Sequence, residues 1–225
     1  MKKHGNSAEA IAQRLQRQWR GDNYAPGELI PSERELASTL GASRPMIREA
    51  IRLLQAQGVL EVQHGVGSRF SSSLHKPLSN SVRLLLPENM QCLLQLNEVR
   101  LALEPAIARQ AAMRANPEGI AELRRVHESM AAATTTDAAA DADVAFHRQI
   151  AKLSENKIFG MLLDSITDLD RQSRCITIRN AGKQRAVQHH GRILAAIAAH
   201  APAKAEAAMR YHIGKAIADL GMEKR

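Results

Sequence analysis

The sequence predicts a mostly α-helical protein, with a small N-terminal helical domain that ends in a β-hairpin and a larger all-helical bundle behind it. Composition is the first reason: hydrophobic residues make up 44% of the 225 residues and aromatic residues only 3%, which favours packed helices over aromatic-rich sheets. The second reason is a series of helix-capping signals along the chain. The third is a polar, proline-ended segment at 71–77, which divides the chain into two parts that can each bury a core.

The first expected helix follows Ser7, whose hydroxyl can cap a helix start. Behind it, Ile11, Leu15 and Trp19 recur every four residues and so lie on one helix face. A loop is expected at 22–27, where polar and turn-forming residues follow. This helix therefore supplies an apolar face to the N-terminal core.

Two short helices separated by a tight turn come next. Ser32 and Glu35 have the spacing of a capping box, in which each side chain satisfies an unbonded backbone N–H at the helix start. That helix is expected to stop at Gly41. Ser43 can cap a third helix, with Pro45 in the first turn, where its missing N–H does no harm. Helix, glycine turn and helix in this order are typical of a helix-turn-helix.

A β-hairpin is expected at 59–70, after the third helix ends at Gly58. Two short extended segments there flank a glycine-containing turn at 64–67. A hairpin directly after a helix-turn-helix gives the winged form of that motif, in which the wing can lie along phosphate or the minor groove. The N-terminal domain is therefore predicted to be a winged helix-turn-helix.

A row of arginines distinguishes the third helix. Arg44, Arg48 and Arg52 recur every four residues, apart from the apolar face that packs into the core. Guanidinium groups can contact guanine or phosphate from a helix in the major groove. A row of charges is more often a solvated surface, but its place between a capping box and a hairpin favours a DNA-reading helix.

Charge and cysteines indicate the broad class of protein. The formal net charge is +8, with +3 over residues 1–75 (ten Lys/Arg, seven Asp/Glu) and +5 over the rest, so it suggests a polyanionic partner without locating the contact. Cys92 and Cys175 form no CxxC pair, which argues against a disulfide framework or a thiolate zinc site. Because no apolar run reaches about 18 residues, we expect a cytoplasmic protein with no membrane partner.

The N-terminal motifs closely resemble the DNA-binding domain of GntR-type repressors, over nearly all of residues 8–70. The resemblance rests on segments 31–37, 41–44, 48–54 and 58–60. It implies double-stranded operator DNA as the partner. It implies DNA contacts by Arg34, Ser43, Arg44 and Arg48, with His64 and Gly65 at the tip of the wing. Pro45 and Met46 depart from the small or hydroxylated residue that the family often has at that place.

The rest of the chain is expected to be helical. Helices are predicted at about 89–115 with a bend at Pro105, and at about 118–131, 138–154, 156–176, 184–200 and 203–219. Asn116 and Pro117 mark one helix start, as cap and first residue. We assign 7–72 to the DNA-binding domain, 73–82 to a linker and 83–222 to a helical domain that binds a ligand and a metal ion.

A candidate metal site lies in the second domain. Asp143 and His147 are four residues apart and therefore share a helix face, while His190 and His212 lie on two later helices. One carboxylate and three imidazoles brought together in a bundle can hold a divalent ion and leave coordination positions open. Taken singly, each histidine is more often a hydrogen-bonded core residue than a metal ligand.

The same residues resemble the FCD sensor domain of the FadR-like branch of GntR regulators, over roughly residues 90–220. The resemblance rests on segment 143–147, Asn156, segment 193–197, His190 and His212. It implies that Asp143, His147, His190 and His212 hold a divalent metal ion, most simply zinc, with nickel and manganese as alternatives. The family places its ligand three residues before the position of Ile193, which selects His190 over its neighbour His189.

Two further residues are candidates for binding an effector. Arg100 lies four residues before Glu104, so the two form either an ordinary ion pair or a site in which Arg100 receives an effector carboxylate. Asn156 is either a helix cap or a hydrogen-bonding residue of the pocket.

These features predict a homodimeric transcription regulator that is not an enzyme. We expect a repressor of organic-acid or sugar-acid catabolism genes, released from its operator by a small carboxylate bound at the metal. An open metal site could also serve an enzyme, but no residue stands out as a general base. A sensor of long-chain acyl-CoA without metal is a third alternative, against which the four intact ligand positions argue.

Overall fold

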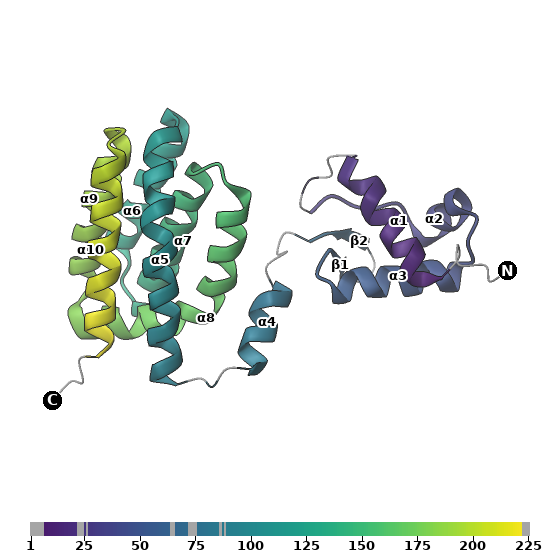
Figure 1. Cartoon of the computed structure of the whole chain (residues 1–225), viewed down its shortest axis with the longest axis horizontal. Coiled ribbons are helices and arrows are strands. Elements are labelled where there is room, and N and C mark those ends of the chain that lie inside the picture. The colour runs from purple at the N-terminus through teal and green to yellow at the C-terminus, as the bar shows by residue number, and fades with distance from the viewer. Residues whose placement is uncertain are drawn as a thin grey trace. The chain divides into compact units, whose positions relative to one another are not determined.

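The computed structural model describes residues 7–21, 25, 27–63, 66–71, 76–85, 87 and 89–221. The chain forms two compact units, Met1–Pro77 and Leu78–Arg225, here named the N-terminal unit and the C-terminal unit (Figure 1). The predicted fold class, mostly helical with one small hairpin, is confirmed. None of the helices within the described ranges is long and apolar enough to cross a membrane.

The N-terminal unit follows the predicted order of elements. These are α1 (Ala8–Gly21), α2 (Glu33–Leu40), α3 (Arg44–Ala56), β1 (Leu60–Gln63) and β2 (Gly67–Phe70). The capping box is present, because the Ser32 side chain accepts from the Glu35 N–H and the Glu35 carboxylate accepts from the Ser32 N–H. Gly41 has φ 62°, a left-handed conformation that ends α2 and that side chains with a Cβ rarely adopt.

The core of this unit is apolar. Ile47 and Leu54 of α3 are fully buried against Leu15 of α1. The ring of Trp19 packs edge-on against Phe70, 5.1 Å between centroids, which holds the hairpin to α1. Leu36 of α2 and Leu60 of β1 complete this core beside the periodic faces of α1 and α3.

The hairpin carries an addition that the sequence analysis did not assign. Strands β1 and β2 pair antiparallel from Leu60 opposite Phe70 to Gln63 opposite Gly67. Leu29 forms an isolated bridge with Arg69, and the Ile30 N–H donates to the Ser68 carbonyl at 2.9 Å. The segment after α1 thus adds an extended edge to the wing. Residues 64 and 65 lie outside the described residues.

The C-terminal unit is all-helical in its described part. Its elements are α4 (Lys76–Leu85), α5 (Met90–Arg114), α6 (Pro117–Ala132), α7 (Thr136–Leu153), α8 (Lys157–Ala181), α9 (Lys183–Ala198) and α10 (Pro202–Leu220). Helix α4 was not expected, because Pro77 indicated the end of a linker. Proline is compatible with the first turn of a helix, and residues 76–82 of the assigned linker are helical.

Helix α5 lies beside α10, α7 and α8 in this bundle (Figure 1). Phe146, Ile107 and Ile193 are buried where these helices meet. The same interior also encloses charged and titratable side chains, namely Arg100, Glu104, Asp143, His147, Asp170, Arg174, His190 and His212. Buried charges cost free energy unless they are paired or bind an ion, so this polar interior indicates a site.

Candidate metal centre and nucleic-acid interface

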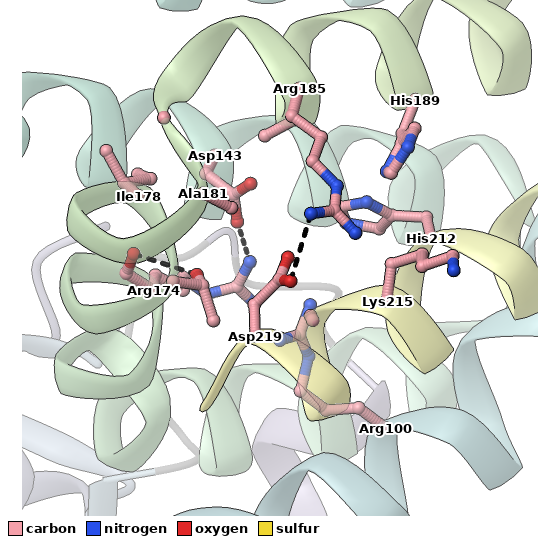
Figure 2. A pocket seen from close by; sticks show the side chains of 14 residues that line it. Arg100, Asp143, Arg174, Ile178, Ala181, Arg185, His189, His212, Lys215 and Asp219 are labelled. Atoms are coloured by element: carbon pink, nitrogen blue, oxygen red, sulfur yellow. Dashed lines mark hydrogen bonds and ion pairs between the residues drawn. The ribbon is translucent and has the colours of Figure 1, made fainter. Parts of the chain in front are cut away.

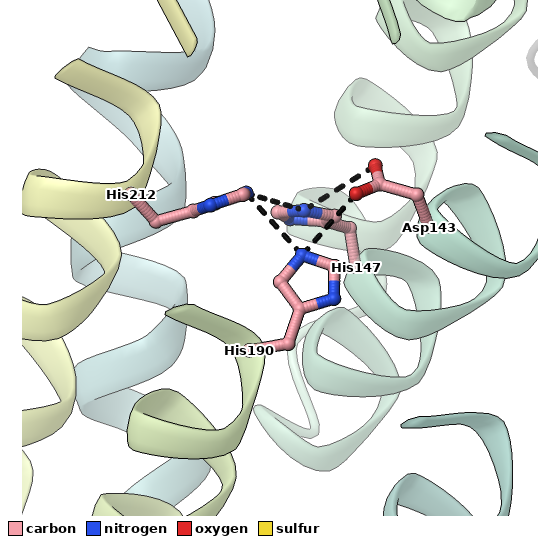
Figure 3. A group of neighbouring side chains, drawn as sticks. All are labelled: Asp143, His147, His190 and His212. Carbon is pink, nitrogen blue, oxygen red and sulfur yellow. Dashed lines mark hydrogen bonds and ion pairs between the residues drawn. The ribbon is translucent and has the colours of Figure 1, made fainter. Parts of the chain in front are cut away.

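Three helices bring the four candidate metal ligands together. Asp143 and His147 lie on α7, His190 on α9 and His212 on α10, and one ligand atom from each lies within 4.8 Å of the others (Figure 3). All four residues are buried. Helix spacing determines only the first pair, whereas the packing of α7, α9 and α10 against α5 positions the other two.

The separations of these atoms fit a bound cation. His212 Nε2 lies 3.2 Å from His147 Nε2 and 3.3 Å from His190 Nε2, and Asp143 Oδ1 lies 3.2 Å from His190 Nε2. An ion about 2.1 Å from each ligand places neighbouring ligand atoms roughly 3.0–3.4 Å apart for octahedral to tetrahedral angles. Three imidazole nitrogens and a carboxylate oxygen at these separations form a donor set that fits a divalent metal ion.

Glu104 orients one of the ligands. Its carboxylate accepts a hydrogen bond from Nδ1 of His147, which leaves the lone pair on Nε2 for a metal ion. Burial opposes ionisation of this carboxyl, but Arg100 and His147 outweigh burial and hold the pKa of Glu104 below its ordinary value. Glu104 is thus a buried anion that supports the metal centre from α5.

The other two histidines are held as neutral rings. Burial, with smaller contributions from neighbouring positive groups, lowers the pKa of His190 and of His212 well below the usual histidine value. Phe146 stacks on His190 with 4.1 Å between centroids and 7° between planes, which fixes that ring. Neutral imidazoles bind metal ions without first losing a proton.

Two buried arginines stand beside the ligands. Arg100 donates to Glu104 at 2.7 Å, to Asn97 at 2.9 Å and to Asp170 at 2.9 Å, so the i,i+4 ion pair considered above is present. Arg174 of α8 pairs with Asp143. Among the described atoms, Nη2 of Arg100 and Nη2 of Arg174 find no hydrogen-bond partner, although both are buried. A buried donor without an acceptor is costly, so both atoms are candidates for binding an anion.

A pocket opens onto this centre. Arg100, Asp143, Arg174 and His212 contribute to its wall, and its cavity volume is about 30 Å³ (Figure 2). Asn156 is not among its lining residues; instead its Oδ1 accepts from the N–H groups of Ile158 and Phe159 at the start of α8. Arg100 therefore lines the pocket, whereas the side-chain oxygen of Asn156 caps α8.

Several pocket residues escaped the sequence analysis, namely Arg174, Arg185, Lys215 and Asp219. Asp170 and Arg174 have the same four-residue spacing as Arg100 and Glu104. That spacing also occurs in exposed pairs such as Glu206 and Arg210, so it could not separate buried from surface pairs.

The candidate nucleic-acid interface lies on α2 and α3. Arg34, Arg44 and Arg48 are exposed, and Ser43 stands at the N-cap of α3 without a side-chain capping hydrogen bond. Arg48, 51% exposed, forms an ion pair with Glu33 at 2.9 Å. His64 and Gly65, the wing-tip candidates, lie outside the described residues. The solvated-row interpretation and the DNA interpretation both require exposed arginines, and the structure provides them.

Comparison with protein families gives two matches along the chain. The model described as "Bacterial regulatory proteins, gntR family" matches residues 7–70. The model described as "FCD domain" matches residues 95–215, more than half of the chain. The first match covers the winged helix-turn-helix, and the second covers the metal centre.

Individual relatives match over most of their length. The HTH-type transcriptional regulator LutR of Bacillus subtilis is 31% identical over 84% of this chain and 89% of its own. The Glc operon transcriptional activator of Escherichia coli K12 is 29% identical over 91% of this chain and 85% of its own. The solved structure of Streptococcus agalactiae GntR has 30% identity and a TM-score of 0.78, covering 94% of this chain and 99% of that one.

Proposed function

The chain belongs to the GntR family of bacterial transcription regulators and carries an FCD domain, and from this premise we propose its mode of action. It acts as a cytoplasmic homodimeric repressor of organic-acid or sugar-acid catabolism genes. A small carboxylate binds at the metal centre of the C-terminal unit and releases the protein from its operator. The observation that carries the proposal is the pair of buried guanidinium groups, each with an unpartnered Nη2, beside an Asp-His₃ cluster.

DNA binding is assigned to the exposed arginines of the N-terminal unit. Arg44 and Arg48, near the start of α3, reach base edges or phosphates when this helix enters the major groove. Two copies related by a twofold axis read half-sites about 34 Å apart, one turn of DNA. Ser43 and Arg34 add contacts beside them, as do His64 and Gly65 at the wing.

Charge balance favours a carboxylate as the effector. Arg100, Arg174, Arg185, Lys215 and a divalent ion at the cluster would bring six formal positive charges, against four negative ones from Asp143, Glu104, Asp170 and Asp219. Burial and the nearby Arg100 hold the pKa of Arg174 well below its usual range, so an added anion stabilises the charged guanidinium. A bound carboxylate lowers the positive excess and accepts from both arginines.

The bound ion has a defined part in this scheme. Asp143, His147, His190 and His212 would hold it, and it would offer a positive charge and open positions to an effector oxygen. Zinc is our first assignment, with nickel or manganese as alternatives, since imidazole and carboxylate suit all three. Glu104 keeps His147 in the tautomer that binds metal.

The lining of the pocket argues for a charged effector. Four of its lining residues are arginine or lysine, namely Arg100, Arg174, Arg185 and Lys215, and Asp143 and His212 of the candidate metal cluster also line it. A long acyl chain would bury apolar surface against these charged groups, which disfavours the acyl-CoA alternative. Asn156 remains a proposed effector residue, although its Oδ1 caps α8, so its amide nitrogen is the group that could serve.

Regulation follows from the difference between the protein with a bound carboxylate and the protein without one. A carboxylate that accepts from Arg100 of α5 and Arg174 of α8 changes the contacts between these helices, and coupling of this kind typically amounts to ~1–3 kcal/mol. One relative is named an activator, so the sign of regulation in this chain is tested by transcription from its own operator.

The test combines metal analysis, ligand screening and operator binding. We expect protein purified without an affinity column to contain about one divalent ion per chain, and small carboxylic acids to raise its melting temperature in a concentration-dependent way. His190→Ala should abolish both results and leave a folded N-terminal unit that still binds operator. Full metal content in His190→Ala, or operator binding unchanged by every stabilising acid, contradicts the proposal.

A further inference from the structure

A second carboxylate stands in the pocket beside the metal centre. Asp219 lies in the last turn of α10, its side chain is only 7% exposed, and it pairs with Arg185 of α9 at 3.1 Å (Figure 2). Its backbone carbonyl accepts from the side-chain amide of Asn180 on α8 at 2.9 Å. Three helices therefore meet at this one residue.

Asp219 differs from the other acidic groups of the site. Asp143 also lines the pocket, but it belongs to the metal cluster, and Glu104 and Asp170 are bonded to Arg100 behind the wall. The remaining ionisable lining groups are basic or imidazole, namely Arg100, Arg174, Arg185, Lys215, His189 and His212. Asp219 is thus an anion within a pocket built mainly to attract anions.

An acid that enters this pocket meets the ion pair of Arg185 and Asp219. Both residues line the pocket, as do Arg100 and Arg174. Arg185 is 37% exposed and Asp219 stands at a helix end, where few backbone hydrogen bonds resist a shift. The pair is therefore able to separate when a ligand offers Arg185 another carboxylate.

We propose that Asp219 occupies the position of a second acidic group of the effector, and that Arg185 is the residue that recognises this group. The effector is then a dicarboxylic acid. One carboxylate binds at the metal end, with Arg100 and Arg174, and the other takes Arg185 from Asp219. This inference rests on the proposed function, because it assumes that the pocket receives a carboxylate.

This change of ion-pair partner for Arg185 also alters the contacts at the end of α10. When an effector takes Arg185, the Asp219 side chain loses its ion pair, while the Asn180 hydrogen bond to its carbonyl still ties α10 to α8. The last turn of α10 becomes the part of the site that responds to a dicarboxylate. A monocarboxylate leaves this pair in place and engages only the metal end.

A purely structural ion pair is the competing explanation, and the number of carboxylate groups on the ligand separates the two. Calorimetric titration of the zinc-loaded full-length protein compares dicarboxylates with monocarboxylates of equal carbon number. The pairs are malonate with propionate, succinate with butyrate, and glutarate with valerate. In the wild type we expect the best dicarboxylate to bind at least tenfold more tightly than its matched monocarboxylate. Equal affinities in every pair overturn the inference and leave the proposed function standing.

Variants identify the residues responsible. Arg185→Gln should weaken the best dicarboxylate at least tenfold and change monocarboxylate affinity less than twofold. Arg192→Gln, on an exposed part of the same helix outside the pocket, is the matched control and should change neither. Asp219→Asn should tighten dicarboxylate binding at least threefold, because the competing charge is gone.

The other outcomes are equally decisive. An Asp219→Asn protein that keeps its zinc content and helical signal but binds dicarboxylates more weakly overturns the inference, since Asp219 then supports the site rather than competing for it. If no acid of either series binds the wild type, this inference fails, and the wider screen of small carboxylic acids described above decides the proposed function.

Discussion

The two units of this chain use buried space in opposite ways. The N-terminal core is built from apolar residues such as Ile47 and Leu54, and the charged groups of α3 stay outside it. The C-terminal core encloses the candidate metal cluster and two arginines. In the first unit the side chains proposed to bind DNA are not those that hold the fold together. In the second the residues proposed to bind ligands are buried in the core, so we expect stability and ligand binding to be coupled there.

The largest effect should come from breaking a buried charge pair of the C-terminal unit. Glu104→Ala leaves Arg100 and His147 without their carboxylate, which costs about 3–5 kcal/mol of unfolding free energy. Urea unfolding followed by circular dichroism measures it. Glu122→Ala, at an exposed ion pair with Arg125, is the control and should leave the midpoint unchanged. Equal midpoints for both variants would remove the contrast between the units.

The N-terminal unit should show the reverse pattern. Arg44→Ala or Arg48→Ala should weaken operator binding about tenfold to hundredfold if each side chain makes a bidentate contact. Thermal unfolding and metal content should stay as in the wild type, because both side chains are exposed. Fluorescence anisotropy with an operator duplex, repeated at two salt concentrations, provides the affinities. A fall in melting temperature as large as that of Glu104→Ala would contradict the separation of binding from folding.

Acid should destabilise the metal-free protein through its core histidines. Burial keeps the pKa of His190 and His212 below the usual value in the folded state, so the unfolded chain binds more protons below pH 6.5. Stability therefore falls as pH falls, by up to about 2 kcal/mol for the pair between pH 6.5 and 5.5. Urea unfolding of chelator-treated protein at both pH values measures this loss. His212→Gln should lose about half of the slope; an unchanged slope would assign it to other groups.

The smallest effect concerns the ion pair of Arg48 with Glu33. Hydrogen bonding to Arg48 holds the pKa of Glu33 below its ordinary value, so the carboxylate stays charged beside the DNA-facing helix. Glu33→Gln should tighten binding to non-operator DNA about twofold to fivefold, because it removes a negative charge near phosphates. Competition with non-operator duplex measures the change. Weaker binding to every duplex would show that Glu33 positions Arg48 rather than competing for it.

The winged domain could be predicted closely because its signals are local. The capping box of Ser32 and Glu35, the left-handed Gly41 and the four-residue recurrence of arginines depend on near neighbours in the chain. Helix α4 was missed because Pro77 is compatible both with a linker and with a first helical turn. The added edge at Leu29 was missed because it pairs with Arg69, forty residues away.

The four candidate metal ligands were all named from the sequence, but their spacing linked only two of them. Spacing placed Asp143 and His147 on one helix face, and resemblance to a family added His190 and His212. Nothing in the sequence indicated that Arg174 and Asp219 would join them, since both belong to helices with many other charged residues. Exposed and buried charges look the same until the helices are packed.

The sequence by itself determined the helices, their caps and the exposed arginine row, because each depends on residues within about one turn of one another. Only the tertiary structure decided which charges are buried and which carboxylate faces Arg185. Those contacts join helices that are far apart in the chain, and a side chain's environment is created by packing rather than by its neighbours in sequence.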